Sequence, residues 1–205
     1  MTSQYNELSG QSIDRLQVLA DGVFAVAMTL LVLDLRLPDV EANGNRALWD
    51  QLLDLGPQLA AYLLSFTMLG TFWLAQHTFL ERCRRSDRML AWATLTFLFF
   101  VSTLPFSAST LAEHVHLSLA VGLYWANLLG LGLALGWQIW HADSAGLTDD
   151  PGALSLVRRR LVLAQSLYAV AAALALLSPP AGIIGLAVVQ LFFIVSPRLP
   201  VRSRT

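Results

Sequence analysis

Residues 15–38 read RLQVLADGVFAVAMTLLVLDLRLP, and this stretch decides the fold class of the chain. Most of it is apolar, and its length is close to the roughly 20 residues that a transmembrane helix needs. Asp21 nevertheless lies inside its first half, and Thr29 lies among its leucines. A carboxylate in hydrocarbon costs about 2.5–3.5 kcal/mol on insertion scales. The stretch therefore predicts a transmembrane helix whose aspartate has a partner other than lipid.

The composition of the whole chain is that of a membrane protein. Its 205 residues are 56% hydrophobic and only 13% charged, which is too little charge to cover the surface of a soluble domain of this size. The net charge of -1 gives no reason to expect a nucleic-acid partner. Cys83 is the single cysteine, so the sequence offers neither a disulfide framework nor a cysteine metal cluster.

Six apolar segments follow one another along the chain, each close to the length of a membrane span. They cover about residues 15–37, 57–81, 87–108, 115–141, 156–177 and 181–196. Between the first two, Leu48, Leu52 and Leu55 recur at helical spacing and predict a short amphipathic helix on the surface. We therefore expect an all-α integral membrane protein, with residues 1–205 forming one domain of six transmembrane helices.

The arginines predict the orientation of the chain in the membrane. All thirteen basic residues are arginines. If the six apolar segments each cross the membrane, only Arg36 and Arg46 fall on the side opposite the N-terminus. The other eleven precede the first segment, surround the second and fourth loops, or follow the sixth segment. The positive-inside rule then places both termini in the cytoplasm, which requires an even number of spans such as six.

Polar side chains of three helices lie at one predicted depth. At 1.5 Å per residue, Asp21 lies about 9 Å inward from Arg15, and His77 and Thr94 lie at similar depths on the next two helices. Trp73 is one turn from His77 on the same helix face. We expect Arg15, Asp21, Trp73, His77 and Thr94 to form a polar cluster that satisfies groups that lipid cannot. Its role is helix packing, or else a proton relay or an ion ligand, and one Asp with one His per chain favours packing.

A second feature of the first helix is the stripe Gly22, Val26, Thr29, Leu30 and Leu33, which falls on one face at 100° per residue. Asp21, Phe24, Met28 and Leu31 point largely to the other side. If that side packs against the second and third helices, the stripe faces lipid, another span or a symmetry axis. Periodicity alone does not choose among these three.

The first helix resembles that of the transmembrane protein 175 potassium channels of endosomes and lysosomes and their bacterial homologues. RLQVLADG, residues 15–22, is similar to the family signature of Arg, three variable residues and Phe-Ser-Asp-Gly. Arg15, Asp21 and Gly22 match it, whereas Leu19 and Ala20 replace Phe and Ser. PQLAAYLLSFTMLGTFWLAQH, residues 57–77, and DRMLAWATLTFLFFVSTLPFSA, residues 87–108, also look like the family.

The resemblance implies an assembly and a site that periodicity does not. It implies a homotetramer around a central pore lined by the first helix of each subunit. Val26, Leu30 and Leu33 match the hydrophobic constriction of the family, and Thr29 matches a hydroxyl layer tied to ion preference. Asp21 would then hold the pore helix against its supports. No carbonyl filter of the TVGYG type is present in the sequence.

These observations predict a potassium-permeable cation channel of a bacterial plasma membrane. Its partners would be copies of itself, membrane lipids and monovalent cations, with K+ as the permeant ion and no cofactor or metal centre. The alternative is a proton-coupled secondary transporter in which Asp21 and His77 titrate. An enzyme is not expected, because the scattered histidines form no catalytic arrangement.

Overall fold

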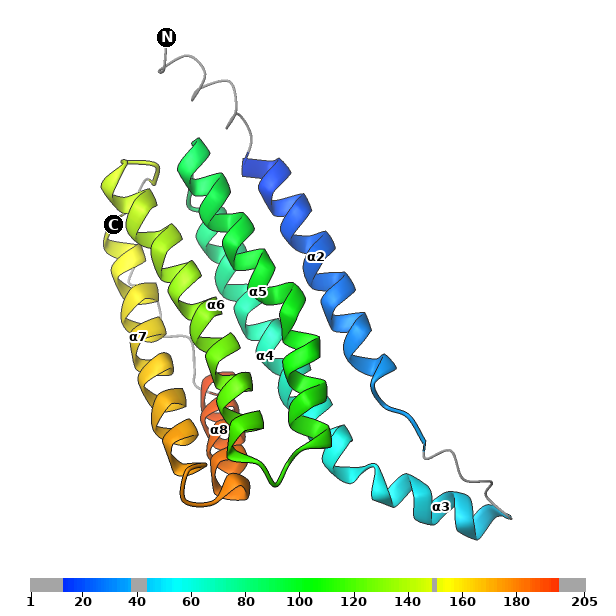
Figure 1. The fold of residues 1–205 in the computed structure, drawn as a ribbon. Coiled ribbons are helices and arrows are strands. Elements are labelled where there is room, and N and C mark those ends of the chain that lie inside the picture. The colour runs from blue at the N-terminus through cyan, green and yellow to red at the C-terminus, as the bar shows by residue number, and fades with distance from the viewer. Residues whose placement is uncertain (1–12, 38–43, 149–150, 196–205) are drawn as a thin grey trace.

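The computed structural model describes residues 13–37, 44–148 and 151–195, and seven α-helices lie within these ranges (Figure 1). Their bounds are α2 (Ile13–Leu33), α3 (Asn45–Asp54), α4 (Gly56–Leu80), α5 (Arg88–Glu113), α6 (Ser118–Ser144), α7 (Pro151–Leu174) and α8 (Pro179–Val195). Each of the six predicted apolar segments corresponds to one long helix, which confirms the all-helical fold class.

The six long helices form a bundle in which neighbours in the sequence are mostly neighbours in space (Figure 1). α5 packs against α2, α4 and α6, while α7 and α8 pack on each other. α7 also contacts α6, and α8 contacts α4. α2 therefore lies at one edge of the bundle, and among the described helices its main neighbours are α5 and α4, both on one side.

Four of the helices are long and apolar enough to cross a membrane, by length and composition: α2, α4, α5 and α6. α8 is apolar but has 17 residues, which at 1.5 Å per residue span about 26 Å, slightly less than a hydrocarbon core of about 30 Å. α7 is long enough, but Arg158, Arg159 and Arg160 make its first half less apolar. The fold thus establishes a multi-pass membrane protein.

The third predicted segment ends later than expected. The sequence placed the end of this segment near residue 108, shortly after Pro105, a residue type that removes a backbone donor. In the structure Pro105 is buried inside α5, and the helix continues to Glu113. The cost of the missing hydrogen bond is therefore tolerated within a packed helix, as is common for prolines in membrane spans.

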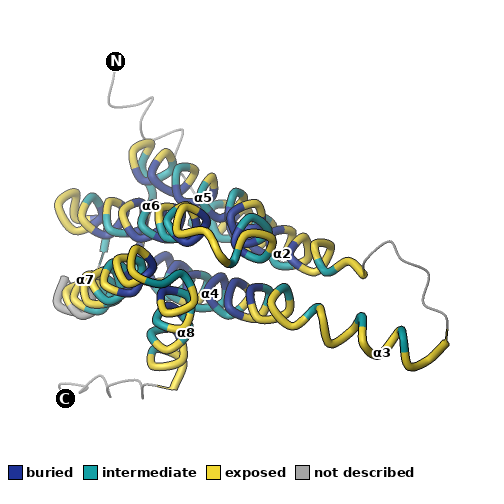
Figure 2. The backbone as a smooth tube through the Cα atoms, turned by 60° about the horizontal axis from the view of Figure 1, so that its bottom comes forward, coloured by how far each residue is buried: buried dark blue, intermediate teal, exposed yellow. Residues whose placement is uncertain are grey.

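The short helix predicted before the second span is present as α3. Leu48 and Leu52 lie on it, and Leu55 is its C-terminal cap. The helix buries none of its residues, and it projects away from the bundle at the end where α2 stops and α4 begins (Figures 1 and 2).

The core between α2, α4 and α5 is built from aromatic side chains. The ring of Phe97 lies 5.9 Å from that of Phe24 and 6.2 Å from that of Phe72, with tilted planes. These centroid distances are in the range preferred by aromatic pairs. Phe24 and Phe97 are almost completely buried, so this contact fixes the inner face of α2 against α5.

Candidate functional site

α2 has two faces of different character. Ala20, Phe24, Ala27 and Leu31 are each 2–3% exposed and pack into the bundle core. The predicted stripe lies on the opposite face, where all five of its residues are exposed in the single chain: Gly22, Val26, Thr29, Leu30 and Leu33. The side chains of the stripe are thus available to a surface outside this chain.

The hydroxyl of Thr29 interrupts the apolar stripe. Its Oγ1 donates to the backbone carbonyl of Val26 at 2.8 Å, one helical turn earlier. Threonine commonly makes this bond within a helix. Because the hydroxyl hydrogen is bound to the helix, the lone pairs of Oγ1 remain free to accept a hydrogen bond or to contact a cation.

Asp21 is held by Trp73 of α4. The indole Nε1 donates to Asp21 Oδ1 at 2.7 Å, and the indole ring stacks on the imidazole of His77 with centroids 5.4 Å apart. Asp21 lies at the boundary between the two faces of α2 and is exposed in the single chain. Within residues 13–37, 44–148 and 151–195, this is the hydrogen bond that Asp21 accepts, and it leaves most of the acceptor capacity of the carboxylate unused.

His77 does not pair with Asp21, which corrects the predicted cluster. Its Nε2 instead contacts Glu81 Oε1 at 3.2 Å, one turn further along α4. Trp73 and His77 lie on one face of α4, and the indole takes the position facing α2. Equal depth in the membrane therefore did not mean contact, because depth leaves the direction of a side chain around its helix undetermined.

Thr94 belongs to a separate polar cluster in the interior of the bundle, which we call the glutamine cluster and define as Gln76, Thr94 and Gln138. Gln138 Oε1 accepts from Gln76 Nε2 at 2.9 Å and from Thr94 Oγ1 at 3.1 Å. All three side chains are at most 1% exposed. The cluster joins α4, α5 and α6, and its only sequence signal was two glutamines within apolar helices.

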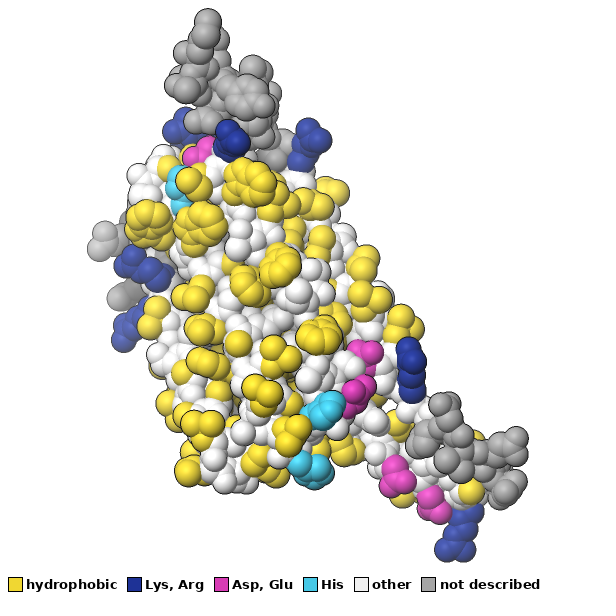
Figure 3. All heavy atoms as spheres, in the orientation of Figure 1, with side chains coloured by type: hydrophobic (Ala, Val, Ile, Leu, Met, Phe, Trp, Pro, Cys, Tyr) yellow, Lys and Arg dark blue, Asp and Glu magenta, His cyan; other side chains and the backbone are white. Residues whose placement is uncertain are grey.

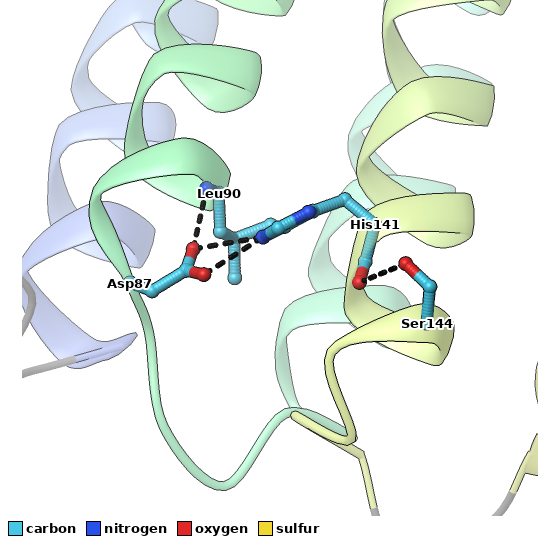
Figure 4. Close-up of polar contacts among 4 residues, drawn as sticks. All are labelled: Asp87, Leu90, His141 and Ser144. Carbon is cyan, nitrogen blue, oxygen red and sulfur yellow. Dashed lines mark hydrogen bonds and ion pairs between the residues drawn. The ribbon is translucent and has the colours of Figure 1, made fainter.

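A further contact that the sequence did not predict closes the end of the bundle where α5 begins (Figure 4). Asp87 caps α5 by accepting from the Leu90 backbone N–H at 2.8 Å. The same carboxylate accepts from His141 Nε2 of α6, with distances of 3.0 and 2.8 Å to its two oxygens. Nearby, the Arg84 backbone N–H donates to the Leu147 carbonyl at 2.9 Å.

The remaining member of the predicted cluster, Arg15, is exposed in the first turn of α2. Among the described residues, no group of three or more His, Cys, Asp and Glu side chains is placed to hold a metal ion. The candidate site is therefore the exposed apolar face of α2 with the hydroxyl of Thr29. Separate polar contacts hold α2 and the neighbouring helices together.

These features define a class: a multi-pass α-helical membrane protein with one span at the edge of its bundle. Comparison with known proteins identifies the family. Residues 15–105 match the model of the endosomal/lysosomal potassium channel TMEM175. A potassium channel of Streptomyces collinus is 32% identical over 174 residues, which cover 81% of this chain and 84% of that protein. The chain belongs to the TMEM175 family, whose members are channels and not enzymes.

Two further relatives extend the comparison. The crystal structure of a lysosomal potassium-selective channel TMEM175 homolog from Chamaesiphon minutus superposes with a TM-score of 0.80 at 26% identity, over 89% of this chain and 96% of that one. The endosomal/lysosomal proton channel TMEM175 of Gallus gallus is 30% identical over 114 residues, which cover 51% of this chain but only 23% of that protein.

Proposed function

We propose that this chain forms a potassium-permeable cation channel whose pore is lined by α2 from each of four identical subunits. Membership of the TMEM175 family and the similarity to a bacterial potassium channel support the potassium ion. The observation that carries the α2 pore is Asp21, an exposed carboxylate in the first half of the most apolar candidate span. Lipid offers no hydrogen-bond donor to the Asp21 carboxylate. The side of α2 that carries Asp21 therefore faces protein or water in the membrane.

In the proposed pore, Val26, Leu30 and Leu33 form successive apolar rings that constrict the passage. Val26 is 57%, Leu30 42% and Leu33 60% exposed in the single chain, so each reaches beyond the bundle surface. Apolar rings exclude water and gate by wetting, because they offer an ion no substitute for its hydration shell. Thr29 adds a ring of hydroxyl oxygens between them, and these oxygens supply the ion preference.

We propose that each subunit is one domain with six spans, including α7 and α8. The Tyr168 hydroxyl of α7 donates to Gln190 Oε1 of α8 at 2.8 Å, and Gln190 Nε2 donates to Thr71 Oγ1 of α4 at 2.9 Å. Hydrogen bonds thus connect α7 to α8 and α8 to α4, one of the four candidate spans. Hydrogen bonds between helices inside the membrane favour this arrangement over a surface position for α7 and α8.

The proposed orientation places the start of α2 and α5 on the cytoplasmic side of a bacterial plasma membrane. Arg15, Arg82, Arg84, Arg85, Arg88 and Arg158–Arg160 gather toward this end, and Arg36 and Arg46 lie toward the other. Hydrophobic side chains cover the middle of the face in Figure 3, between the charged ends. Arg198, Arg202, Arg204 and residues 1–12, which also entered the prediction of two cytoplasmic termini, lie outside the described residues.

Labelling of a Ser3→Cys variant in intact cells tests this orientation. Cys83 interferes little, because it is buried and burial raises the pKa of its thiol to about 12. A Cys83→Ala background removes it entirely. An impermeant maleimide should leave the cysteine at position 3 unlabelled until the cells are opened, whereas labelling from outside would reverse the topology.

Ion flux into liposomes tests the function itself. Potassium and sodium fluxes are compared with and without an imposed proton gradient. The proposal predicts potassium flux down its own gradient that persists when the proton gradient is collapsed. Flux that stops without a proton gradient would instead support the alternative, a proton-coupled transporter using Asp21 and His77. The separate partners of these two side chains, Trp73 and Glu81, argue against that alternative.

A further inference from the structure

Two exposed arginines lie well inside α7, toward the end of the bundle that is proposed to face the cytoplasm. Arg158 and Arg159 are seven and eight residues past Pro151, the first residue of the helix, which is about 10–12 Å along its axis. Both side chains are exposed in the single chain. Figure 3 shows basic side chains on the left flank, where Figure 1 places α7, set apart from those at the top of the molecule. These arginines therefore belong to the surface of a helix and not to a loop.

The contacts between α6 and α7 give the level of the two arginines along the bundle. The side chain of Gln165 packs against Gly132. One turn nearer to the start of α7, Leu161 faces Gly136, where a Cβ would lie 3.6 Å from Leu161 Cδ2. The two helices are antiparallel, so four residues back along α7 correspond to four residues forward along α6. The same register places the two arginines level with residues 138–139 of α6.

Two tryptophans of α6 lie on either side of this level. Trp137 and Trp140 are 36% and 61% exposed and are three residues apart, on one helix face. On one side, the α6–α7 pair is covered by α4, which contacts α6, and by α8, which contacts α7; Gln190 of α8 also donates to Thr71 of α4. The exposed tryptophans and arginines lie on the other, outer side. We call these four residues the arginine–tryptophan surface: Trp137, Trp140, Arg158 and Arg159.

The neighbouring helix segments provide no negative charge to this surface. Residues 133–141 of α6 and 154–163 of α7 contain no Asp or Glu, and neither does α8. Arg160 is partly buried and interacts within the protein, so it is not counted in the surface. A guanidinium without a counter-charge is costly in a membrane span, and its long side chain extends toward the headgroups. Two such arginines in one span call for an anion from outside the chain.

We propose that the arginine–tryptophan surface binds an acidic phospholipid of the cytoplasmic leaflet, an inference that rests on the proposed assignment of α7 as a membrane span. Arginine binds phosphate oxygens through two parallel hydrogen bonds, and basic surfaces between transmembrane helices bind anionic headgroups. Tryptophan rings favour the headgroup level. A zwitterionic lipid carries its own cation beside the phosphate, whereas an acidic lipid brings a net negative charge to the arginines. The bound lipid joins α6 to α7 at the side of the bundle away from α2.

Titration of the purified full chain with phosphatidylglycerol in a neutral detergent tests the proposal, with phosphatidylcholine as the matched neutral lipid. Native mass spectrometry counts the retained lipids, and thermal unfolding measures the stabilisation. Saturable retention of phosphatidylglycerol in preference to phosphatidylcholine is expected. The double variant Arg158→Gln, Arg159→Gln should weaken it about tenfold or more, because it removes both charges. The control is Arg85→Gln with Arg88→Gln, which removes two exposed arginines at the same end, outside the surface, and should change retention less than about twofold.

A change without charge separates a built surface from general attraction to the basic end of the bundle. Trp140→Leu should weaken retention of phosphatidylglycerol about threefold, because it removes an aromatic ring beside the headgroup at unchanged net charge. Trp92→Leu is its control, since Trp92 is 56% exposed on α5 and lies outside the surface. Elution volume without added lipid identifies any variant that has failed to assemble, and the remaining variants then decide the matter.

Equal retention of the two lipids by the wild-type chain would overturn the proposal. Equal weakening by the two double arginine variants would do so too, because it would indicate diffuse charge. Stabilisation by inorganic phosphate alone, to the same extent as by phosphatidylglycerol, would mean that the surface binds a free anion and no lipid. None of these measurements uses ion flux. Failure of the lipid site therefore leaves the flux test of the channel intact, and the absence of flux leaves the lipid test intact.

Discussion

The two faces of α2 are made of similar side chains but meet different surroundings. Phe24 and Leu31 on one face are 2% exposed and pack into the core, whereas Leu30 and Leu33 on the other are 42% and 60% exposed. Apolarity alone does not distinguish them, since lipid, a neighbouring subunit and a pore wall all accept leucine. The difference is carried by the polar residues at the edge and centre of the exposed face, Asp21 and Thr29.

In the proposed channel, α2 packs into the subunit with one face and lines the pore with the other. Its inner face is fixed by shape, through the contact of Phe24 with Phe97. Its edge is fixed by the hydrogen bond from Trp73 to Asp21. The outer face makes no packing contact with the described helices of the subunit, and in the proposed pore it is the face that meets the ions. Substitutions on the two faces should accordingly change different measurements.

The largest effect is expected on the inner face. Phe24→Ala should lower the free energy of unfolding by about 3–5 kcal/mol, because it leaves a cavity against Phe97. Val26→Ala, two residues away on the exposed face, should change it by less than about 0.5 kcal/mol in a single subunit. Thermal unfolding in detergent measures both. Equal losses for the two variants would break the distinction between the faces.

Asp21 at the edge should give the next largest effect. Asp21→Ala removes a charge-assisted hydrogen bond and leaves Trp73 Nε1 without its acceptor, a loss of about 1.5–3 kcal/mol. Asp21→Asn retains an amide oxygen that can accept from the indole, so it should preserve more of the stability and of the oligomer. Size-exclusion chromatography and thermal unfolding measure the difference.

The variants Asp21→Ala and Asp21→Asn also test the alternative in which Asp21 relays protons. If Asp21 carries protons, both variants should abolish proton coupling in an intact oligomer. Potassium flux through Asp21→Asn with an unaltered pH dependence would eliminate the relay.

Asp87, at the start of α5, is a second carboxylate with which Asp21 can be compared. Asp87 accepts from both Leu90 and His141, whereas the hydrogen bond from Trp73 is the one that the structure gives Asp21. Asp87→Ala removes a helix cap, and caps contribute about 0.5–2 kcal/mol, so unfolding should occur at lower temperature. The ratio of potassium to sodium flux should not change. A shift in that ratio would mean that this end of the bundle also controls the pore.

A small effect on ion preference, specific to one hydroxyl, is expected at Thr29. Thr29→Val keeps the shape of the side chain and removes the hydroxyl, and Thr29→Ser keeps the hydroxyl. Loss of a hydrogen-bond-sized contribution of about 0.5–1.5 kcal/mol corresponds to a change of about 2- to 13-fold in the potassium-to-sodium ratio. The ratio should move in Thr29→Val and stay close to wild type in Thr29→Ser. Unchanged ratios in both variants would remove Thr29 from the ion path.

The sequence predicted the helices better than it predicted their contacts. Six apolar runs of membrane-spanning length were sufficient for the helical class, because such runs are made of residues close together in the chain. The contact between Asp21 and Trp73 was within reach because depth and the Trp–His spacing limited the partners. Helical periodicity placed Leu30 on one face with Val26, Thr29 and Leu33, and the structure shows that this face is exposed in the single chain.

The contacts that were missed connect helices that are remote in the sequence. Gln76 meets Gln138 across 62 positions, and Asp87 meets His141 across 54. Which face each helix presents to the other depends on the packing of the whole bundle, and no local pattern encodes it. The expected Asp21–His77 pair failed for the same reason. Two side chains make contact only if they lie at the same depth in the membrane and also point toward each other from their helices.

The central claim is that the outer face of α2 lines a pore, and flux through a Leu30→Ala oligomer tests it most directly. Leu163→Ala on α7 is the matched control, because Leu163 is 50% exposed and α7 packs on α6 and α8 at a distance from α2. The account predicts larger potassium flux, weaker discrimination against sodium and an intact oligomer for Leu30→Ala, with no change for Leu163→Ala. Unchanged flux and unchanged discrimination in an intact Leu30→Ala oligomer would contradict it.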